Sequence, residues 1–339
     1  METYLEISFL SLQFPRALSP EGSCFFTGRV LHANCKGMPL QKTRYRQRRQ
    51  ELHASHLPVK ISYYLTVEKE NSLILFQIDG VMRKTALITG ASKGIGRELA
   101  ILFAENGCNL VLVSRSDHEL GQLKEMLESA HPVSVEVIVK DLSMPGAVQE
   151  LYDGIKAREI EVDYLVNNAG FGDYGSFTDT SWDRYEQMIT LNVTTLAHLT
   201  HLFAREWRGR KAGRILNISS TAAFQPGPMM AVYFATKSFV LHLSEAIGHE
   251  CRKDNITVTT LCPGPTSTHF GEESKMNAAQ LVKNVKIANA REVAQLGYRA
   301  MMKGKRAVIH GAMNKLAPFG IRFLPRKWVT RLSAKVMEL

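Results

Sequence analysis

Short apolar segments alternate with amphipathic segments over most of this chain, from residue 85 to residue 310. The apolar segments are almost wholly hydrophobic, which predicts strands that are buried on both faces of a sheet. The segments between them carry apolar residues at helical spacing. The alternation therefore predicts a single α/β domain with a doubly wound, mostly parallel, seven-stranded sheet covered by helices. The predicted strands span residues 85–90, 109–115, 134–142, 162–170, 213–220, 256–265 and 305–310.

A glycine-rich turn, TGASKGIG at residues 89–96, joins the first predicted strand to the first predicted helix. Gly90, Gly94 and Gly96 allow the backbone to approach a pyrophosphate and allow the helix to pack close to the strand. The N–H groups at the start of the helix attract the phosphates. Glycine-rich turns also arise for steric reasons alone, but the position between a strand and a helix favours a dinucleotide site.

The second predicted strand ends in Ser114 and Arg115. Enzymes that select NAD usually carry an acidic residue there, which binds the ribose 2′-hydroxyl. Arg115 and the nearby Lys93 instead supply cations, and a guanidinium fork suits a 2′-phosphate. We therefore expect NADP(H) as the cofactor, with two ordinary surface cations as the alternative.

Tyr233 and Lys237 lie four residues apart on a predicted helix and share one of its faces. A nearby ammonium lowers the pKa of a tyrosine from its usual value of about 10, which favours acid–base catalysis. Ser220 ends the fifth predicted strand, and Asn192 lies in a helix predicted over Trp182–Trp207. Ligands bind at the carboxyl ends of the strands in this architecture, so we expect these side chains to meet there. A tyrosine–lysine pair alone is more often a solvated helix face.

With these motifs, TGxxxGxG and YxxxK, residues 82–339 resemble the short-chain dehydrogenase/reductase family. The resemblance implies a Rossmann-like oxidoreductase that interconverts a ketone and a secondary alcohol with NADP(H). It implies that Tyr233 transfers a proton to the substrate oxygen and that Ser220 orients this oxygen. Lys237 would bind the nicotinamide ribose and lower the pKa of the tyrosine, and Asn192 would hold a water that leads to this lysine. The implied cofactor residues are Gly90, Ser92, Lys93, Gly94, Ile95, Gly96, Arg115, Asp141, Leu142, Asn168, Tyr233, Lys237, Pro263, Gly264 and Thr266.

The substrate end of the site is expected after the fourth, fifth and sixth strands. Its candidate residues are apolar and adaptable, with ordinary packing as an equal alternative: Phe171, Phe224, Met229 and Met230. The tail is also similar to long-chain 3-oxoacyl-CoA and steroid reductases of the family. This similarity implies an apolar ketone or a fatty-acyl thioester, and a role in lipid metabolism. A protein that binds NADPH as a sensor without turnover is the competing hypothesis, which the four catalytic residues disfavour.

The formal net charge of +10 is unevenly distributed. Residues 301–339 hold nine basic side chains and one acidic side chain, a net charge of +8. Residues 1–81 hold ten basic and seven acidic side chains, a net charge of +3, so residues 82–300 carry a net charge of −1. A local basic patch, rather than a broad nucleic-acid surface, follows from this distribution. No apolar run reaches the roughly 18 residues typical of a spanning helix. We expect a cytoplasmic homo-oligomer, a dimer or a tetramer, with peripheral membrane contact as an alternative.

The predicted C-terminal helix, residues 326–339, is the candidate for that membrane contact. Trp328, Leu332, Val336 and Leu339 share one of its faces, and basic residues lie beside them. Such a helix packs against the protein or a subunit, or it lies on an anionic membrane surface. Packing is the more common outcome.

Residues 1–81 lack the periodicity and the motifs found later, and they are expected to form a poorly structured extension, with Met82 as the natural start. Segments 61–67 and 72–78 could pair as a hairpin. A functional arm or tether is the alternative, although three glutamates near the N-terminus argue against a transit peptide. The five cysteines have neither metal-ligand nor redox spacing, so we expect no metal.

Overall fold

The computed structural model describes residues 49–52, 59–68, 71–81, 83–268, 270, 274 and 287–338. The chain divides into two compact units, Met1–Gln50 with Ser62–Gln77, and Glu51–Ile61 with Ile78–Leu339. The described residues before Met82 form a three-stranded sheet in the order β1-β2-β3. Its strands are β1 (Arg49–Leu52), β2 (Val59–Glu68) and β3 (Asn71–Val81). The two segments expected to pair are thus neighbouring strands, and the rest of the predicted extension lies outside the described residues.

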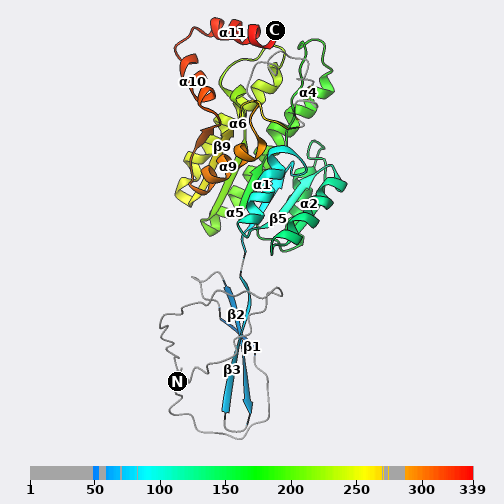
Figure 1. Ribbon diagram of the computed structural model, residues 1–339, viewed down its shortest axis with the longest axis vertical. Helices are drawn as coiled ribbons and strands as arrows, with labels where there is room; N and C mark the ends of the chain where they lie inside the picture. Colours follow the sequence, from blue (N-terminus) through cyan, green and yellow to red (C-terminus); the bar gives the residue numbers. More distant parts are fainter. Residues whose placement is uncertain are drawn as a thin grey trace. The chain divides into compact units, whose positions relative to one another are not determined.

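A second sheet has seven strands in the order β10-β9-β8-β7-β4-β5-β6, and every neighbouring pair is parallel. This confirms the predicted architecture (Figure 1). The strand order reverses between β4 and β7, which creates the crevice where ligands bind in open α/β sheets. The strands are β4 (Thr85–Thr89), β5 (Asn109–Ser114), β6 (Val135–Val139), β7 (Tyr164–Asn167), β8 (Gly213–Ile218), β9 (Ile256–Cys262) and β10 (Ala307–Ile309).

Helices cover both faces of this sheet. One face packs against α1 (Gly94–Glu105), α2 (Asp117–Ala130) and α9 (Ala290–Met302). The other face packs mainly against α3 (Ala147–Ala157) and α5 (Leu196–Arg210), with α6 (Ala231–Glu250) beside them. The remaining helical elements are α4 (Trp182–Ile189), η1 (Thr190–Thr195), η2 (Thr221–Phe224), η3 (Cys251–Asp254), α10 (Ala312–Ile321) and α11 (Arg326–Glu338).

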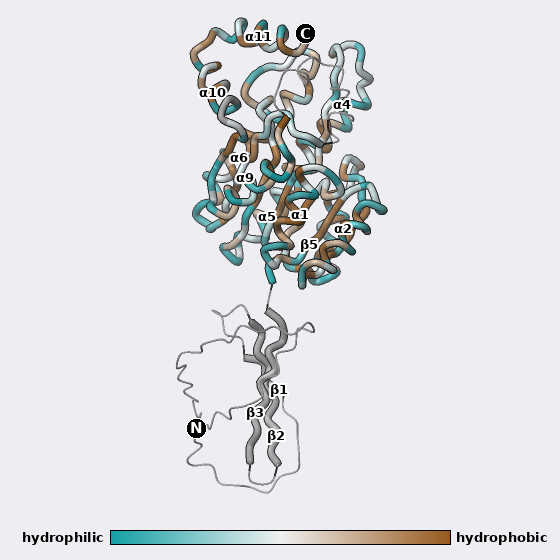
Figure 2. The backbone as a smooth tube through the Cα atoms, viewed as in Figure 1, coloured by the Kyte–Doolittle hydropathy of each residue, from teal (hydrophilic) through white to brown (hydrophobic). Residues whose placement is uncertain are grey.

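Strand β4 shows how one apolar strand packs against the helices on both faces of the sheet. Ala86 and Ile88 are fully buried in the core that holds α1 and α9, whereas Leu87 is fully buried against α3 and α5. Successive side chains of a strand point to opposite faces, so a strand covered on both sides is apolar throughout. Figure 2 shows this as brown, hydrophobic stretches of the central strands.

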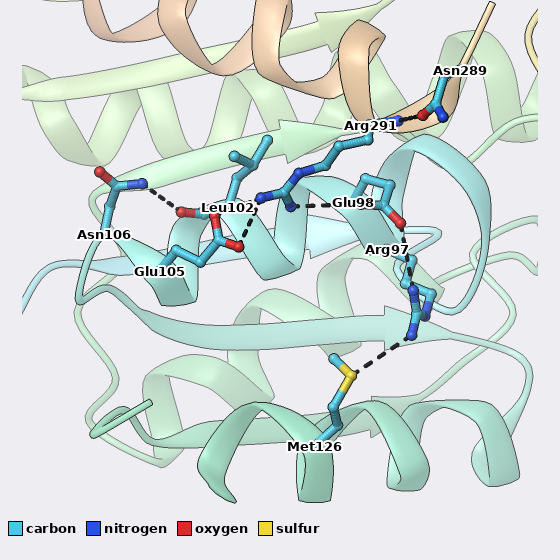
Figure 3. Close-up of polar contacts among 8 residues, drawn as sticks. All are labelled: Arg97, Glu98, Leu102, Glu105, Asn106, Met126, Asn289 and Arg291. Atoms are coloured by element: carbon cyan, nitrogen blue, oxygen red, sulfur yellow. Dashed lines mark hydrogen bonds and ion pairs between the residues drawn. The ribbon is translucent and has the colours of Figure 1, made fainter. Parts of the chain in front are cut away.

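Arg291 ties α9 to α1 across the sequence (Figure 3). One guanidinium nitrogen donates to both carboxylate oxygens of Glu105, at 2.7 and 2.6 Å, and another lies 3.5 Å from the carboxylate of Glu98. The backbone N–H of Arg291 donates to the side chain of Asn289, which caps the start of α9. These contacts hold α9 against α1, the helix that follows the glycine turn.

None of the helices in the described part of the chain is long and apolar enough to cross a membrane. Within the same residues, Cys108, Cys251 and Cys262 are free thiols, and Cys24 and Cys35 lie outside them.

Candidate active site

The glycine turn between β4 and α1 has a backbone conformation and close contacts that residues with a side chain could not adopt without strain. Gly90 and Gly94 have φ angles of +65° and +57°, which L-residues with a side chain rarely adopt. A Cβ at Gly96 would lie 2.2 Å from the carbonyl oxygen of Gly90 and 2.4 Å from the side-chain nitrogen of Asn168. Lys93, which precedes α1, makes no side-chain cap, and Gly94 and Ile95 at the start of the helix line the adjoining cavity. The turn thus forms a cradle for an anion.

Asn168 fastens the end of β7 to this turn. Its side-chain amide donates to the carbonyl oxygens of Thr89 and Gly90, at 3.0 and 2.9 Å. The hydroxyl of Thr89 in return accepts the backbone N–H groups of Asn168 and Ala169, both at 3.1 Å. These bonds hold the two strands together at the point where the strand order reverses.

A cavity of about 580 Å³ begins at this turn and follows the carboxyl ends of the strands. We name it the active-site cavity. It brings together most residues that the sequence singled out, from the glycine turn to the tyrosine helix. Those that line it are Gly90, Ser92, Lys93, Gly94, Ile95, Arg115, Asp141, Leu142, Asn168, Phe171, Ser220, Phe224, Met230, Tyr233, Lys237, Pro263, Gly264 and Thr266.

The two cations at the cofactor end both face carboxylates. The ammonium of Lys93 lies 3.2 Å from Glu119, and a guanidinium nitrogen of Arg115 lies 4.0 Å from Asp141. Partial burial raises the pKa of Asp141, but hydrogen bonds from Ser143 and the charge of Arg115 outweigh it and keep the pKa below its usual value. A 2′-phosphate would therefore compete with these carboxylates for the two cations.

Tyr233 and Ser220 face each other inside the active-site cavity. Tyr233 is only 8% exposed, and burial raises the pKa of its hydroxyl to about 12, against a hydrogen bond from Ser220 that lowers it. The sequence predicts a lowered pKa through Lys237. The structure shows the opposite direction, because the loss of solvation dominates and the lysine ammonium lies over the ring, 5.7 Å from its centroid.

Lys237 lines the active-site cavity and is only 5% exposed. Its ammonium donates to the carbonyl oxygen of Ile218 at 3.0 Å, and burial lowers its pKa to about 8. The backbone carbonyl of Lys237 accepts a hydrogen bond from the Ser219 hydroxyl at 2.8 Å, which ties α6 to the end of β8.

Asn192 lies in η1, a π-helical turn that interrupts the helix predicted over Trp182–Trp207. Turns of this kind widen a helix locally and recur at functional sites. The Asn192 side chain exchanges two hydrogen bonds with the backbone of Phe171 and donates a third to Thr236. A Cβ at Gly170 would lie 2.8 Å from the Asn192 oxygen and 3.5 Å from the Lys237 nitrogen, so both side chains flank this glycine. Asn192 itself is buried and does not line the cavity.

The structure does not place Met229 in the cavity wall, where the sequence predicts it. Its φ angle of +65° turns the chain, and its carbonyl accepts the backbone N–H of Gly175 at 2.8 Å. The neighbouring Met230 faces the cavity instead and is 3% exposed. Gly96 of the glycine turn also lies outside the lining.

One whole wall of the cavity was not predicted from the sequence. Helices α10 and α11 contribute Asn314, Pro318, Ile321, Ser333, Val336 and Met337 to its lining. The hydroxyl of Tyr174 donates to the carbonyl of Met337 at 2.6 Å and anchors the end of α11. A signal was present, because the buried residues Val329, Ser333 and Met337 recur every four positions and form an inward stripe.

Comparison with known proteins identifies the family to which the chain belongs. The sequence model of the short chain dehydrogenase family matches residues 84–279. This chain belongs to the short-chain dehydrogenase family. As a member, it is an oxidoreductase that acts on CH–OH and C=O groups of a small molecule with a nicotinamide cofactor.

Relatives in the family act on different substrates. The chain is 28% identical over 182 residues to a 7beta-hydroxysteroid dehydrogenase of Mediterraneibacter gnavus, which covers 54% of this chain and 68% of the relative. It is 34% identical over 180 residues to a very-long-chain 3-oxoacyl-CoA reductase of Mycosarcoma maydis. This alignment covers 52% of this chain and 51% of the relative. The structure of a short-chain dehydrogenase from Sphingobium yanoikuyae in complex with NADPH matches with a TM-score of 0.64 and 32% identity, over 70% of this chain and 93% of that one.

The residues of this short-chain dehydrogenase fit a nicotinamide dinucleotide. The glycine cradle and the start of α1 suit the pyrophosphate, because an added Cβ would fill the space the backbone leaves there. Both Arg115 and Tyr233 line the same cavity. One continuous cavity thus holds both a cofactor cradle and a buried acid–base group.

Proposed function

We propose that this enzyme uses NADP(H) to interconvert an apolar ketone and the corresponding secondary alcohol. The observation that carries the proposal is the shared cavity, in which the anion cradle of α1 and the hydroxyl of Tyr233 lie along one continuous wall. A sensor without turnover needs the cradle but does not need a buried tyrosine beside a serine and a lysine.

The bound cofactor supplies the hydride that reduces the carbonyl carbon. Tyr233 gives a proton to the carbonyl oxygen as charge develops there, and its raised pKa keeps this proton in place at neutral pH. The Ser220 hydroxyl orients the same oxygen. Lys237 holds the cofactor ribose, and Asn192 holds a water that leads protons toward this lysine. In the oxidative direction Tyr233 accepts the proton instead.

An apolar substrate is proposed from the far end of the cavity. The wall there carries Phe171, Phe224, Phe234 and Met230, together with the apolar side chains of α10 and α11. Aromatic and methionine side chains bind bulky apolar ligands by packing and adapt to their shape. The names of the steroid and acyl-CoA relatives support this substrate class.

The test is a panel of ketones and 3-oxoacyl thioesters, followed by the loss of NADPH absorbance. We expect turnover on bulky apolar ketones or acyl thioesters, and slower turnover on small polar ones. Tight NADPH binding without turnover of any member would favour the sensor instead.

The pH dependence of the reaction follows from the shifted pKa values of Tyr233 and Lys237. Reduction needs protonated Tyr233, with a pKa of about 12, and charged Lys237, with a pKa of about 8. We therefore expect kcat/KM for reduction to stay level below pH 8 and to fall as the pH rises through the pKa of the lysine. Oxidation needs the phenolate, so its rate should increase with pH up to that point. A reductive rate that rises through the same range would contradict the assignment.

Replacing Arg115 with aspartate should shift the preference from NADPH toward NADH. The change removes the proposed partner of the 2′-phosphate and places a second carboxylate beside Asp141. The ratio of kcat/KM with NADPH to that with NADH should fall about tenfold or more, as one lost ion pair with a phosphate allows. Arg97→Asp, in α1 and outside the cavity lining, is the matched control. An unchanged ratio in Arg115→Asp would refute the role of this arginine.

We further propose that residues 82–339 form the catalytic domain and that the enzyme works as a homo-oligomer. The seven-stranded sheet and the described cavity lining use only residues after Met82. Deletion of residues 1–81 should therefore leave the melting temperature and kcat/KM for ketone reduction unchanged. Insoluble or inactive protein, with the full chain active in parallel, would show that the domain depends on the preceding residues.

A further inference from the structure

Helices α10 and α11 and the connection between them carry exposed apolar side chains that nothing in the described part of the chain covers. Their exposed fractions range from 40% for Leu324 to 74% for Phe323, and Trp328 is 56% exposed. The rings of Phe319 and Phe323 contact each other edge to face, with centroids 5.3 Å apart. We call this set the terminal apolar face: Leu316, Phe319, Phe323, Leu324, Trp328, Leu332 and Val336.

Helix α11 has two apolar stripes with different surroundings. Val329, Ser333 and Met337 are at most 5% exposed and pack onto the domain. Trp328, Leu332 and Val336 each precede one of these residues by one position, which places them about 100° around the helix. At least half of each of these three side chains is exposed. One stripe therefore anchors the helix, and the second leaves about half of each side chain exposed.

Cations surround the terminal apolar face. Every basic residue of α10, α11 and their connection is exposed, and none is within ion-pair distance of a carboxylate in the described residues. The only acidic residue after His310 is Glu338. The cations are Lys315, Arg322, Arg326, Lys327, Arg331 and Lys335.

The same two helices form a wall of the active-site cavity. Pro318 and Ile321 of α10, and Val336 and Met337 of α11, line it. Val336 belongs to both surfaces, since it is 50% exposed and also lines the cavity. A second, smaller hollow of about 120 Å³ lies between α10, α11 and Gln225. Figure 1 shows both helices at the end of the domain where the C-terminus lies.

We propose that α10 and α11 bind an anionic phospholipid surface, with the terminal apolar face in the headgroup boundary and the cations on the lipid phosphates. Exposed aromatic and leucine side chains flanked by lysine and arginine are the features that bind such interfaces. An apolar substrate then enters the cavity from the lipid, along Val336. This last step rests on the proposed function, whereas the binding itself does not.

A second copy of this chain fits the same face less well. A two-fold contact would bring each face against its own equivalent, and so would place six cations against six. Like charges held close together across an interface cost several kcal/mol. An anionic lipid surface has the complementary charge instead.

Vesicle flotation of the full-length protein tests the proposal. Vesicles of phosphatidylcholine with phosphatidylglycerol should carry the protein upward, pure phosphatidylcholine vesicles should carry much less, and salt should weaken the binding. Phe319→Ser combined with Phe323→Ser and Trp328→Ser should lower binding by about tenfold or more. None of these three residues lines the cavity, so NADPH binding and the turnover of a water-soluble ketone should be unchanged.

Charge reversal supplies the matched comparison. Arg322→Glu with Lys327→Glu should abolish vesicle binding, whereas Lys303→Glu with Lys305→Glu should not. The second pair changes the net charge equally but precedes β10, at the opposite end of that strand from α10. Equal vesicle binding by both pairs, or no binding by the unaltered protein, would overturn the proposal. Dissociation of an oligomer by the Phe319, Phe323 and Trp328 changes would also overturn it, in favour of a second copy. If the unaltered protein binds vesicles but turns over no ketone, the result would contradict only the proposed function.

Discussion

Replacing Tyr233 with phenylalanine should lower kcat for ketone reduction about a thousandfold, because a positioned acid typically contributes 10²–10⁴-fold. The substitution removes one oxygen atom from a buried side chain and leaves the ring in its contacts with Phe234 and Phe270. NADPH binding, measured by fluorescence titration, should therefore change little. The loss should appear in kcat and in kcat/KM alike, as for a group that acts on the transition state.

Tyr185→Phe is the matched control for this change. Tyr185 is buried in the same apolar cluster, and its hydroxyl donates to the carbonyl of Phe177, but it does not line the active-site cavity. Its kcat should stay close to that of the unaltered enzyme. Equal activity of Tyr233→Phe and Tyr185→Phe would remove Tyr233 from the reaction.

Replacing Gly96 with alanine should damage both stability and cofactor binding. The added Cβ would come within 2.2 Å of the Gly90 carbonyl oxygen and 2.4 Å of the Asn168 amide, so the glycine turn has to move. Overpacking of this kind costs about 1–3 kcal/mol, which corresponds to a fall in melting temperature of about 5 °C for a domain of this size. The displaced turn no longer presents its amides to the pyrophosphate, and the Kd for NADPH should rise about tenfold or more.

Gly121→Ala separates this effect from a general response to alanine. Gly121 lies inside α2, and a Cβ there would meet nothing within 4 Å. Because alanine is the better helix former by about 1 kcal/mol, this variant should be slightly more stable. Thermal unfolding and NADPH titration of both variants check the pair. An unchanged Kd in Gly96→Ala would show that the turn does not carry the phosphates.

The sheet was predictable because its signal is local. Each strand is an uninterrupted apolar run, and parallel strands with helical connections allow few topologies. The glycine turn and the Tyr233–Lys237 pair were also visible, since both depend on spacing within one element. Asn192 was visible as a residue, but its π-helical turn was not, and the Phe171 and Thr236 that its side chain contacts lie far from it in the sequence.

What the sequence could not predict depends on distant contacts. The carboxylates that face Lys93 and Arg115 come from Glu119 and Asp141, in other elements. The direction of the Tyr233 pKa depends on burial, which outweighs the nearby charge. The wall formed by α10 and α11 follows from how the tail folds back over the strand ends, and a helical pattern alone does not say what its inward stripe contacts.

The most direct test of the proposed activity follows the hydride itself. NADPH that carries deuterium at the transferred position of the nicotinamide ring is incubated with the enzyme and the best ketone of the panel. We expect a secondary alcohol with one deuterium on the carbinol carbon, formed by the unaltered enzyme and about a thousandfold more slowly by Tyr233→Phe. An alcohol without deuterium, or NADPH that stays bound and unconsumed with every ketone, would contradict it.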